Sequence, residues 1–145
     1  MFRVMKLALF VLILVPQISS AEDNIKKFAE RYMEAQKNAW ENGDFKGLEA
    51  LEEPDVALQN INGSVTVGLE NHKKFIQERR KSLGEIHQEW EYLMGEGNMF
   101  CLSYKWTIKS PNNTFIINGL MVGRIRNGKL IEEWGAGSRV LASSD

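Results

Sequence analysis

Apolar residues recur at helical spacing in three segments of the chain. Between residues 24 and 42 they lie three or four positions apart, which places them on one face of a long helix. The run FKGLEALEE, residues 45–53, predicts a short second helix that Pro54 ends. Sparser apolar positions between residues 69 and 83 still share one helical face. The pattern therefore predicts three helices before residue 84.

The remaining segments have the pattern of β-strands. A short hairpin precedes the third helix, in which VALQN and SVTVG flank the turn signal Asn62-Gly63. Four long strand-like runs follow that helix, at residues 85–97, 98–110, 113–126 and 129–142. Turns this short join antiparallel neighbours, and strands this long favour strong curvature. The expected fold class is α+β: a cone-shaped, strongly curved antiparallel sheet with three N-terminal helices on its concave face.

The first 21 residues have the pattern of a signal peptide. Arg3 and Lys6 precede the apolar run LALFVLILV, and Ser19-x-Ala21 supplies the small residues that a signal peptidase reads. The run is shorter than the roughly 20 residues of a spanning helix, so an uncleaved anchor is the weaker alternative. We expect residues 1–21 to be cleaved near Ala21. One domain, residues 22–145, would remain in the periplasm or outside the cell, with no stable membrane anchor.

Charge and cysteine content exclude some classes of function. Loss of Arg3 and Lys6 with the signal changes the net charge from −1 to −3, and no basic patch indicates a nucleic-acid partner. Cys101 is the only cysteine; we expect it to be buried rather than paired between chains. The sequence has no cysteine–histidine cluster and no Gly-rich phosphate loop, so neither a metal nor a cofactor is expected.

The hairpin turn at Asn127-Gly128 allows the register of the last two strands to be predicted. A two-residue loop would set Gly123 opposite Glu132 and Met121 opposite Trp134. Glu132 and Trp134 would then share the apolar inner face. Glu133 would lie on the outer face, diagonal to Arg124.

An inward Glu132 is the leading candidate for chemistry. A carboxylate on an apolar wall has a raised pKa and can act as a general acid or base. Tyr32 on the first helix and His87 are candidate assistants. The alternative is that Glu132 lies near the rim or makes a structural hydrogen bond. His87, Glu89 and Glu91 alternate about 6.6 Å apart along one strand, too far apart for adjacent ligands of one ion, and His72 is expected at the surface or lining the pocket.

The order of these segments resembles the nuclear-transport-factor-2-like superfamily, in particular its SnoaL-like branch. The resemblance rests on WENGD at residues 40–44, EPDV at 53–56, Gly63 and Gly68 around the hairpin, and NGKLIEEW at 127–134, and it covers residues 24–141. It implies a cone with an apolar pocket between helices and sheet, and often a homodimer formed by the outer sheet face. Members include ketosteroid isomerases, polyketide cyclases, dehydratases, epoxide hydrolases and non-catalytic domains.

The catalytic sets of two of these enzyme classes do not carry over. Alignment with ketosteroid isomerases places Gln36, Asn60 and Met121 at the positions of their tyrosine and two aspartic acids. Polyketide cyclases tend to carry an acidic residue beyond the last-strand tryptophan, where this chain has GAGSRV. Function must therefore be argued from the site.

Aromatic and aligned positions together give the expected pocket lining, although each aromatic could equally be ordinary core. The predicted ligand-binding residues are Tyr32, Gln36, Trp40, Asn60, Phe75, Trp90, Tyr104, Trp106, Met121 and Trp134. The leading hypothesis is an exported domain that binds a small, largely apolar molecule without established catalysis. One alternative is an acid–base enzyme (isomerase, dehydratase, cyclase or hydrolase) using Glu132. The other is a domain that homodimerises through the outer sheet face.

Overall fold

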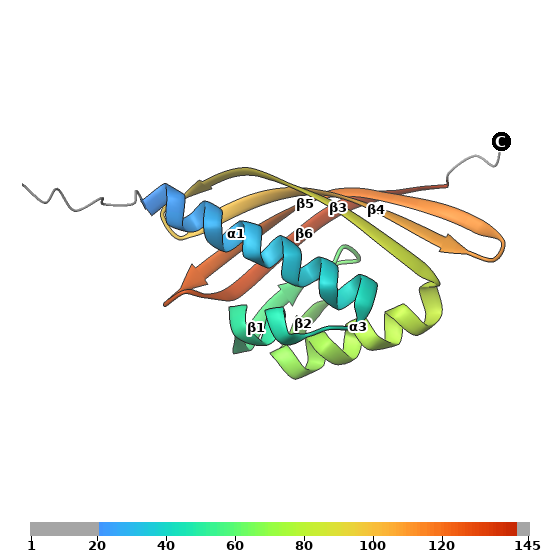
Figure 1. The fold of residues 1–145 in the computed structure, drawn as a ribbon, viewed down its shortest axis with the longest axis horizontal. Helices are drawn as coiled ribbons and strands as arrows, with labels where there is room; N and C mark the ends of the chain where they lie inside the picture. Colours follow the sequence, from blue (N-terminus) through green and yellow to red (C-terminus); the bar gives the residue numbers. More distant parts are fainter. Residues whose placement is uncertain (1–20, 142–145) are drawn as a thin grey trace, which may run out of the picture.

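The computed structural model describes residues 21–141, so the predicted signal peptide lies outside the described residues. Three α-helices and a six-stranded sheet make up these residues, which confirms the predicted α+β class (Figure 1). The helices are α1 (Ala21–Lys37), α2 (Lys46–Leu51) and α3 (Leu69–Leu83), and a π-helical turn, η1 (Asn38–Asn42), continues α1. The strands are β1 (Glu52–Gln59), β2 (Val65–Val67), β3 (Glu85–Glu96), β4 (Met99–Ser110), β5 (Asn113–Arg126) and β6 (Lys129–Leu141). No helix within 21–141 is long and apolar enough to cross a membrane.

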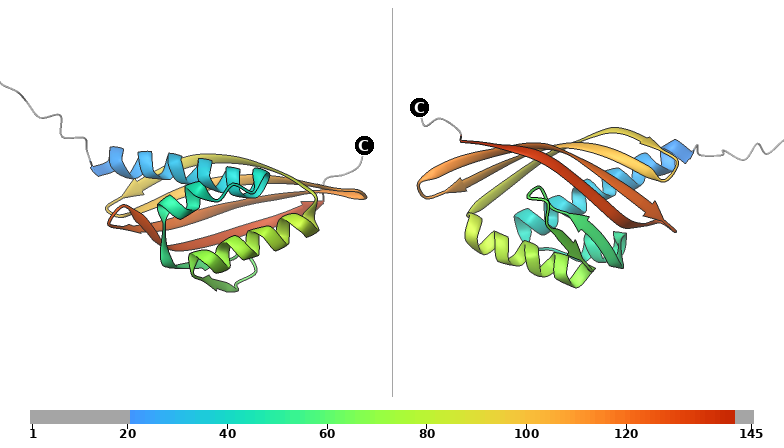
Figure 2. Two further views of the ribbon diagram at one scale, coloured as in Figure 1. Left: turned by 60° about the horizontal axis from the view of Figure 1, so that its bottom comes forward. Right: turned by 180° about the vertical axis from the view of Figure 1, so that it is seen from behind.

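The sheet has the order β2-β1-β6-β5-β4-β3, and β3 to β6 form the predicted antiparallel meander. One pairing differs from the expected antiparallel sheet: β1 runs parallel to β6, with Leu58 opposite Glu133. The sequence did not predict this pairing, because the sequence signals were short turns between neighbouring strands and β1 and β6 are far apart in the chain. The second helix also ends earlier than predicted, because Glu52 already begins β1. The sheet is strongly curved and not closed, and the helices lie on its concave side (Figure 2).

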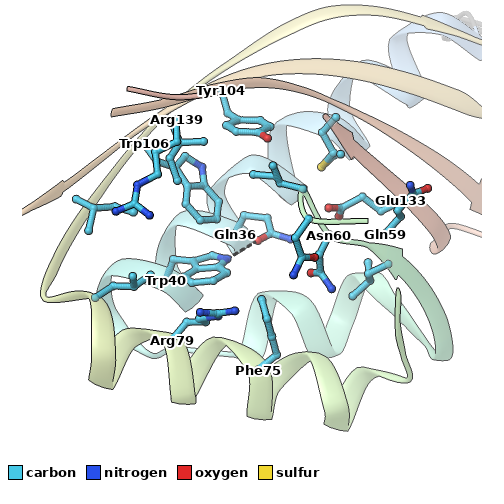
Figure 3. A pocket seen from close by; sticks show the side chains of 18 of the residues that line it. Gln36, Trp40, Gln59, Asn60, Phe75, Arg79, Tyr104, Trp106, Glu133 and Arg139 are labelled. Carbon is cyan, nitrogen blue, oxygen red and sulfur yellow. Dashed lines mark hydrogen bonds between the residues drawn. The ribbon is translucent and has the colours of Figure 1, made fainter. Parts of the chain in front are cut away.

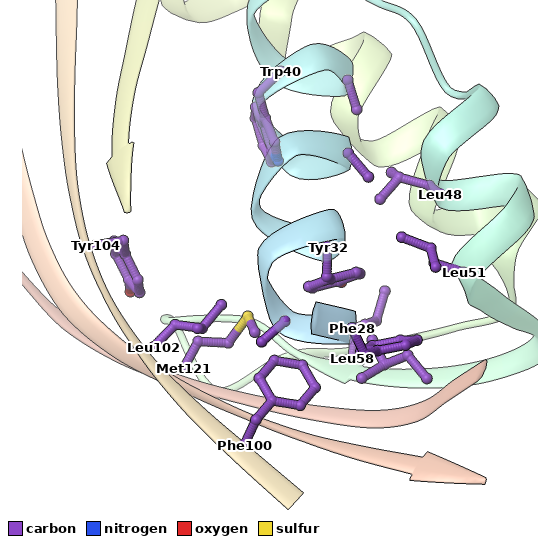
Figure 4. Packing of buried hydrophobic residues seen from close by; sticks show 14 of the residues in the cluster. Phe28, Tyr32, Trp40, Leu48, Leu51, Leu58, Phe100, Leu102, Tyr104 and Met121 are labelled. Atoms are coloured by element: carbon purple, nitrogen blue, oxygen red, sulfur yellow. The ribbon is translucent and has the colours of Figure 1, made fainter. Parts of the chain in front are cut away.

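The core lies between α1 and the concave face of the sheet (Figure 4). Phe28 and Tyr32 from α1 pack against Phe100 of β4, with ring centroids 5.7 Å and 6.1 Å from it. Leu48 and Leu51 of α2 close the other side of the helix. Burial of such side chains is the main force that holds α1 on the sheet. This packing leaves the far end of the concave face, beyond Trp40, for a cavity.

A β-bulge near the Asn127-Gly128 turn overturns the predicted register. Ile125 pairs with Leu130, but the next pair is Arg124 with Glu132, so Ile131 is an extra residue on β6. One extra residue reverses the face of every side chain that follows it. The prediction that Glu132 faces inward and Glu133 outward is therefore wrong, because a regular two-residue hairpin was assumed.

Candidate functional site

A cavity of about 370 Å³ lies between α3, η1, the β1–β2 hairpin and the concave face of the sheet (Figure 3). This volume is within the range of small-molecule sites. Eight of the ten predicted ligand-binding residues line it: Gln36, Trp40, Asn60, Phe75, Trp90, Tyr104, Trp106 and Met121. His72, Arg79, Glu133 and Arg139 also line it and were not among the predicted ligand-binding residues.

The two other predicted ligand-binding residues do not line the cavity. Tyr32 is fully buried beneath it and contacts the lining residue Glu133. Trp134 lies on the outer face beside Val122, with the guanidinium of Arg124 5.1 Å from its ring centroid. Its predicted position is wrong for the same reason as that of Glu132, since both follow the bulge.

Two predicted catalytic residues also lie away from the cavity. Glu132 forms an ion pair with Arg124 at 2.9 Å on the outer face. The side chain of His87 is 56% exposed and lies 3.3 Å from Glu41. The argument that gave Glu132 a chemical role, an inward carboxylate on an apolar wall, therefore applies to its neighbour Glu133.

Glu133 and Tyr32 are the centre of a buried hydrogen-bond network. Tyr32 Oη lies 2.7 Å from Glu133 Oε2 and 3.0 Å from Glu52 Oε1. Gln36 Nε2 donates to the same hydroxyl oxygen at 2.6 Å, and its carbonyl oxygen accepts from Trp40 Nε1 at 3.1 Å. The spacing of four residues from Tyr32 to Gln36 to Trp40 places all three on one face of the first helix and its π-helical extension.

His72 completes the network from the opposite side. Its Nδ1 lies 3.1 Å and 3.0 Å from the two carboxylate oxygens of Glu52, whose side chain is fully buried. The hydrogen bond and charge of Glu52 raise the pKa of His72 overall, although burial alone would lower it. His72 is thus a buried member of the site and not the surface residue that was the main expectation. Its spacing from Leu69 and Phe75 on the helical face was the signal that could have shown this.

The single proton of Tyr32 constrains the protonation of this network. The hydroxyl can donate to only one of the two carboxylates within reach. If Glu133 carries a proton, its own O–H donates to Tyr32 Oη, and Tyr32 donates onward to Glu52. The tyrosine oxygen then accepts from Gln36 and Glu133 with its two lone pairs, so every group has a partner. When Glu133 is ionised, Tyr32 donates to it at 2.7 Å instead, so the network allows Glu133 to gain or lose a proton.

Electrostatic effects also allow Glu133 to gain or lose a proton near neutral pH. Burial raises the pKa of Glu133 to about 7, opposed by the positive charge of His72 and the hydrogen bond from Tyr32, and aided by Glu52. Burial, with the charges of Glu133 and Glu52, raises the pKa of Tyr32 well above its usual value, so the phenol keeps its proton. Glu133 can therefore exchange a proton near neutral pH while Tyr32 keeps its own.

Metal chemistry finds no support within residues 21–141. No group of three or more histidine, cysteine, aspartate or glutamate side chains there is placed to hold an ion. His72 and Glu52 bind each other, and the third carboxylate, Glu133, bonds to Tyr32.

Comparison with known proteins agrees with the fold. The model of the SnoaL-like domain family matches residues 29–133. Comparison with curated proteins finds none that matches. An NTF2-like protein of unknown function from Exiguobacterium sp. 255-15 is 17% identical with a TM-score of 0.63, over 77% of this chain and 98% of that chain. An LEH-like epoxide hydrolase from M. tuberculosis is 15% identical with a TM-score of 0.62, over 82% and 86%.

A third solved structure is IdmH, described as a putative polyketide cyclase from Streptomyces antibioticus. It is 14% identical with a TM-score of 0.62, over 77% of this chain and 91% of that chain. Likeness at these identities shows the fold alone. The family model, however, spans most of the chain, as the sequence resemblance predicted. The chain belongs to the SnoaL-like domain family, and its fold is that of the NTF2-like structure described above.

Proposed function

We propose that the cavity binds a small, largely apolar molecule and that Glu133 exchanges a proton with it. The reaction would be an isomerisation, cyclisation, dehydration or hydrolysis by general acid–base catalysis. The observation that carries the proposal is the Glu133 carboxyl, which lines the cavity, lies 2.7 Å from Tyr32 Oη and has a pKa near 7. A group with a pKa near the working pH is the most effective general acid or base.

The lining supports an apolar ligand. Trp40, Trp106 and Tyr104 present aromatic surface from both the helix and the sheet sides, with the Trp40 and Trp106 centroids 4.7 Å apart. Entry of such a ligand would displace water from around Glu133 and raise its pKa further. Glu133 would then act first as an acid. The fold neighbours described as an epoxide hydrolase and a putative polyketide cyclase show that this architecture hosts enzymes.

The site differs from the acid–base set expected from the sequence in two residues, since His87 also lies away from the cavity. Glu133 replaces Glu132, while Tyr32 keeps its expected place beside the carboxyl. Glu52 lies 3.0 Å from the Tyr32 hydroxyl and holds it in position. His72, which also lines the cavity, in turn fixes the Glu52 carboxylate. We assign Tyr32 as a positioning residue, and Glu133 as the proton-transfer group.

A comparison of neighbouring glutamates tests the proposal. The protein, purified gently from its export compartment, would first be analysed by native mass spectrometry for a retained small molecule. That compound would then be incubated with wild type, Glu133→Gln and Glu132→Gln, with products followed by liquid chromatography and mass spectrometry. We expect both variants to bind it, and Glu133→Gln alone to lose turnover by at least about a hundredfold.

Other outcomes assign different functions. Full turnover by Glu133→Gln would rule out Glu133 as the acid or base. Binding without turnover by the wild type would make the chain a binding protein, the function favoured from the sequence. Absence of any binding, by mass spectrometry or by tryptophan fluorescence with a library of flat apolar compounds, would reject both functions and leave an association domain.

A further inference from the structure

Two arginines line the cavity at the end away from Glu133. Arg79 comes from α3 and Arg139 from β6, so they approach from different walls, and Figure 3 shows both on the side opposite Glu133. Arg79 Cζ lies 5.3 Å from the Phe75 ring centroid, and Arg139 Cζ lies 3.7 Å from that of Phe115. Both rings line the cavity, so aromatic contacts hold the guanidinium groups at its edge.

Neither of these guanidinium groups has a carboxylate partner within residues 21–141. The contrast with neighbouring arginines is clear. Arg80, adjacent on α3, donates to the carbonyl oxygens of Trp40 and Glu41, and Arg124 pairs with Glu132. Arg79 and Arg139 therefore keep their hydrogen-bond donors free for a molecule in the cavity.

The cavity thus has two chemically different ends. Glu133, the only acidic residue among the described residues that line it, lies at one end. The two arginines lie at the other end, where Figure 3 shows Trp40 and Trp106 between Arg79 and Arg139. The indole Nε1–H of Trp106 also has no acceptor among the described residues. A guanidinium binds a planar carboxylate by two parallel hydrogen bonds, which a neutral ligand cannot match.

We infer that the ligand is an amphipathic carboxylic acid. Its flat apolar body lies against the aromatic lining, its carboxylate lies at the end that Arg79 and Arg139 line, and its reactive atom faces Glu133 (Figure 3). This inference rests on the proposed function, since it specifies the ligand class for the same cavity. The carboxylate that the arginines bind is then a different group of the ligand from the carbon or oxygen that exchanges a proton with Glu133.

A matched pair of probes tests the inference: anthracene-2-carboxylic acid and its primary amide, which share the ring system and differ in charge. Quenching of tryptophan fluorescence would report binding to wild type, Arg79→Gln, Arg139→Gln and the exposed control Arg126→Gln. We expect the wild type to bind the acid more tightly than the amide. Each cavity substitution should weaken acid binding by about tenfold and leave amide binding unchanged.

The possible outcomes separate this inference from the proposed function. Equal binding of acid and amide, unaffected by Arg79→Gln and Arg139→Gln, would overturn the carboxylate site and leave the apolar cavity in place. Equal weakening of both probes would show that the arginines only shape the cavity, which also overturns it. If neither probe bound at millimolar concentration, the proposed function would fail as well. Affinity for the acid alone should fall as salt concentration rises.

Discussion

Glu132 and Glu133 are adjacent and chemically identical, yet their environments differ completely. Glu132 is paired with Arg124 at 2.9 Å on the outer face, whereas Glu133 lines a cavity and contacts a buried tyrosine. Desolvation by burial raises the pKa of Glu133 to about 7. A substitution of Glu132 is therefore a suitable control for the same substitution of Glu133.

Replacing Glu133 with Gln should change how stability depends on pH. The pKa of Glu133 rises from an ordinary 4.5 to about 7 on folding, so between these values the folded chain binds more protons and stability falls as pH rises. The Glu133→Gln variant has no carboxyl group at this position, so its stability does not fall with pH for this reason. Relative to wild type, its free energy of unfolding should therefore increase by on the order of 2 kcal/mol between about pH 4.5 and pH 8.

Urea unfolding at both pH values measures this effect. The contribution of His72, present at low pH and lost as pH rises through its raised pKa, occurs in both proteins and largely cancels. Glu132→Gln is the control and should keep the pH dependence of the wild type. The same pH dependence in wild type and Glu133→Gln would contradict a raised pKa at position 133.

Removal of the tyrosine hydroxyl should raise the pKa of Glu133 further. Tyr32 lies 2.7 Å from the carboxyl and stabilises its charged form, so Tyr32→Phe removes a donor that Gln36 and His72 do not replace. Carbon-13 NMR of labelled glutamate side chains, followed from pH 4 to 9, would report the titration. A pKa that stayed near 7 or fell would show that the Tyr32 hydroxyl does not stabilise the ionised form of Glu133.

At the scale of elements, the helices, the meander and most of the cavity lining could be predicted from the sequence. Their periodicity and short turns are local signals, and aromatic residues on separate elements converge in a curved sheet. The bulge at Ile131 and the parallel β1–β6 pairing had no such signal, because both depend on which segments meet in the folded chain. The site acid was misassigned for this reason, although its type and its position to within one residue were predicted.

The glycines of β5 and β6 allow aromatic side chains to lie flat on the sheet. A Cβ atom at Gly119 would collide with the hydroxyl of Tyr104 and with the carbonyl oxygen of Ala136, whereas one at Gly135 would make only ordinary contacts. Gly119→Ala should therefore push Tyr104 into the cavity. We expect a stability loss of on the order of 2 kcal/mol and weaker ligand binding.

Thermal unfolding and probe binding of Gly119→Ala would test this, with Gly135→Ala as the control on the same face. The control should unfold within about 0.5 kcal/mol of the wild type. Equal stability of the two variants would mean that Tyr104 can move without cost.

At the scale of the whole molecule, the helices within residues 21–141 leave the outer sheet face uncovered (Figure 2). Leu93, Met94, Leu120 and Val140 are each at least 43% exposed there, and Cys101, which was expected to be buried, is only partly so. Exposed large apolar side chains that gather on one face commonly mark an interface. We propose that two copies associate through this face.

The dimer prediction can be tested by light scattering during size-exclusion chromatography. The chain without residues 1–21 should elute with twice its monomer mass. Leu120→Glu should convert it to a monomer with an unchanged circular dichroism spectrum. Val65→Glu, on the edge strand β2, is the matched control, because Val65 is also exposed but lies on another strand. A wild-type monomer at micromolar concentration would contradict the proposal.

The position of β6 in the sheet has a consequence for the order of folding. β6 is the last strand to be synthesised, yet it lies between β1 and β5 and joins the N-terminal hairpin to the meander. Pairings between segments so distant in sequence form late and slow the folding rate. A chain still emerging from the ribosome therefore has neither Glu133 nor the strand that connects its two halves. It would stay incompletely folded until β6 has been synthesised, a state that a translocation channel for unfolded chains can accept.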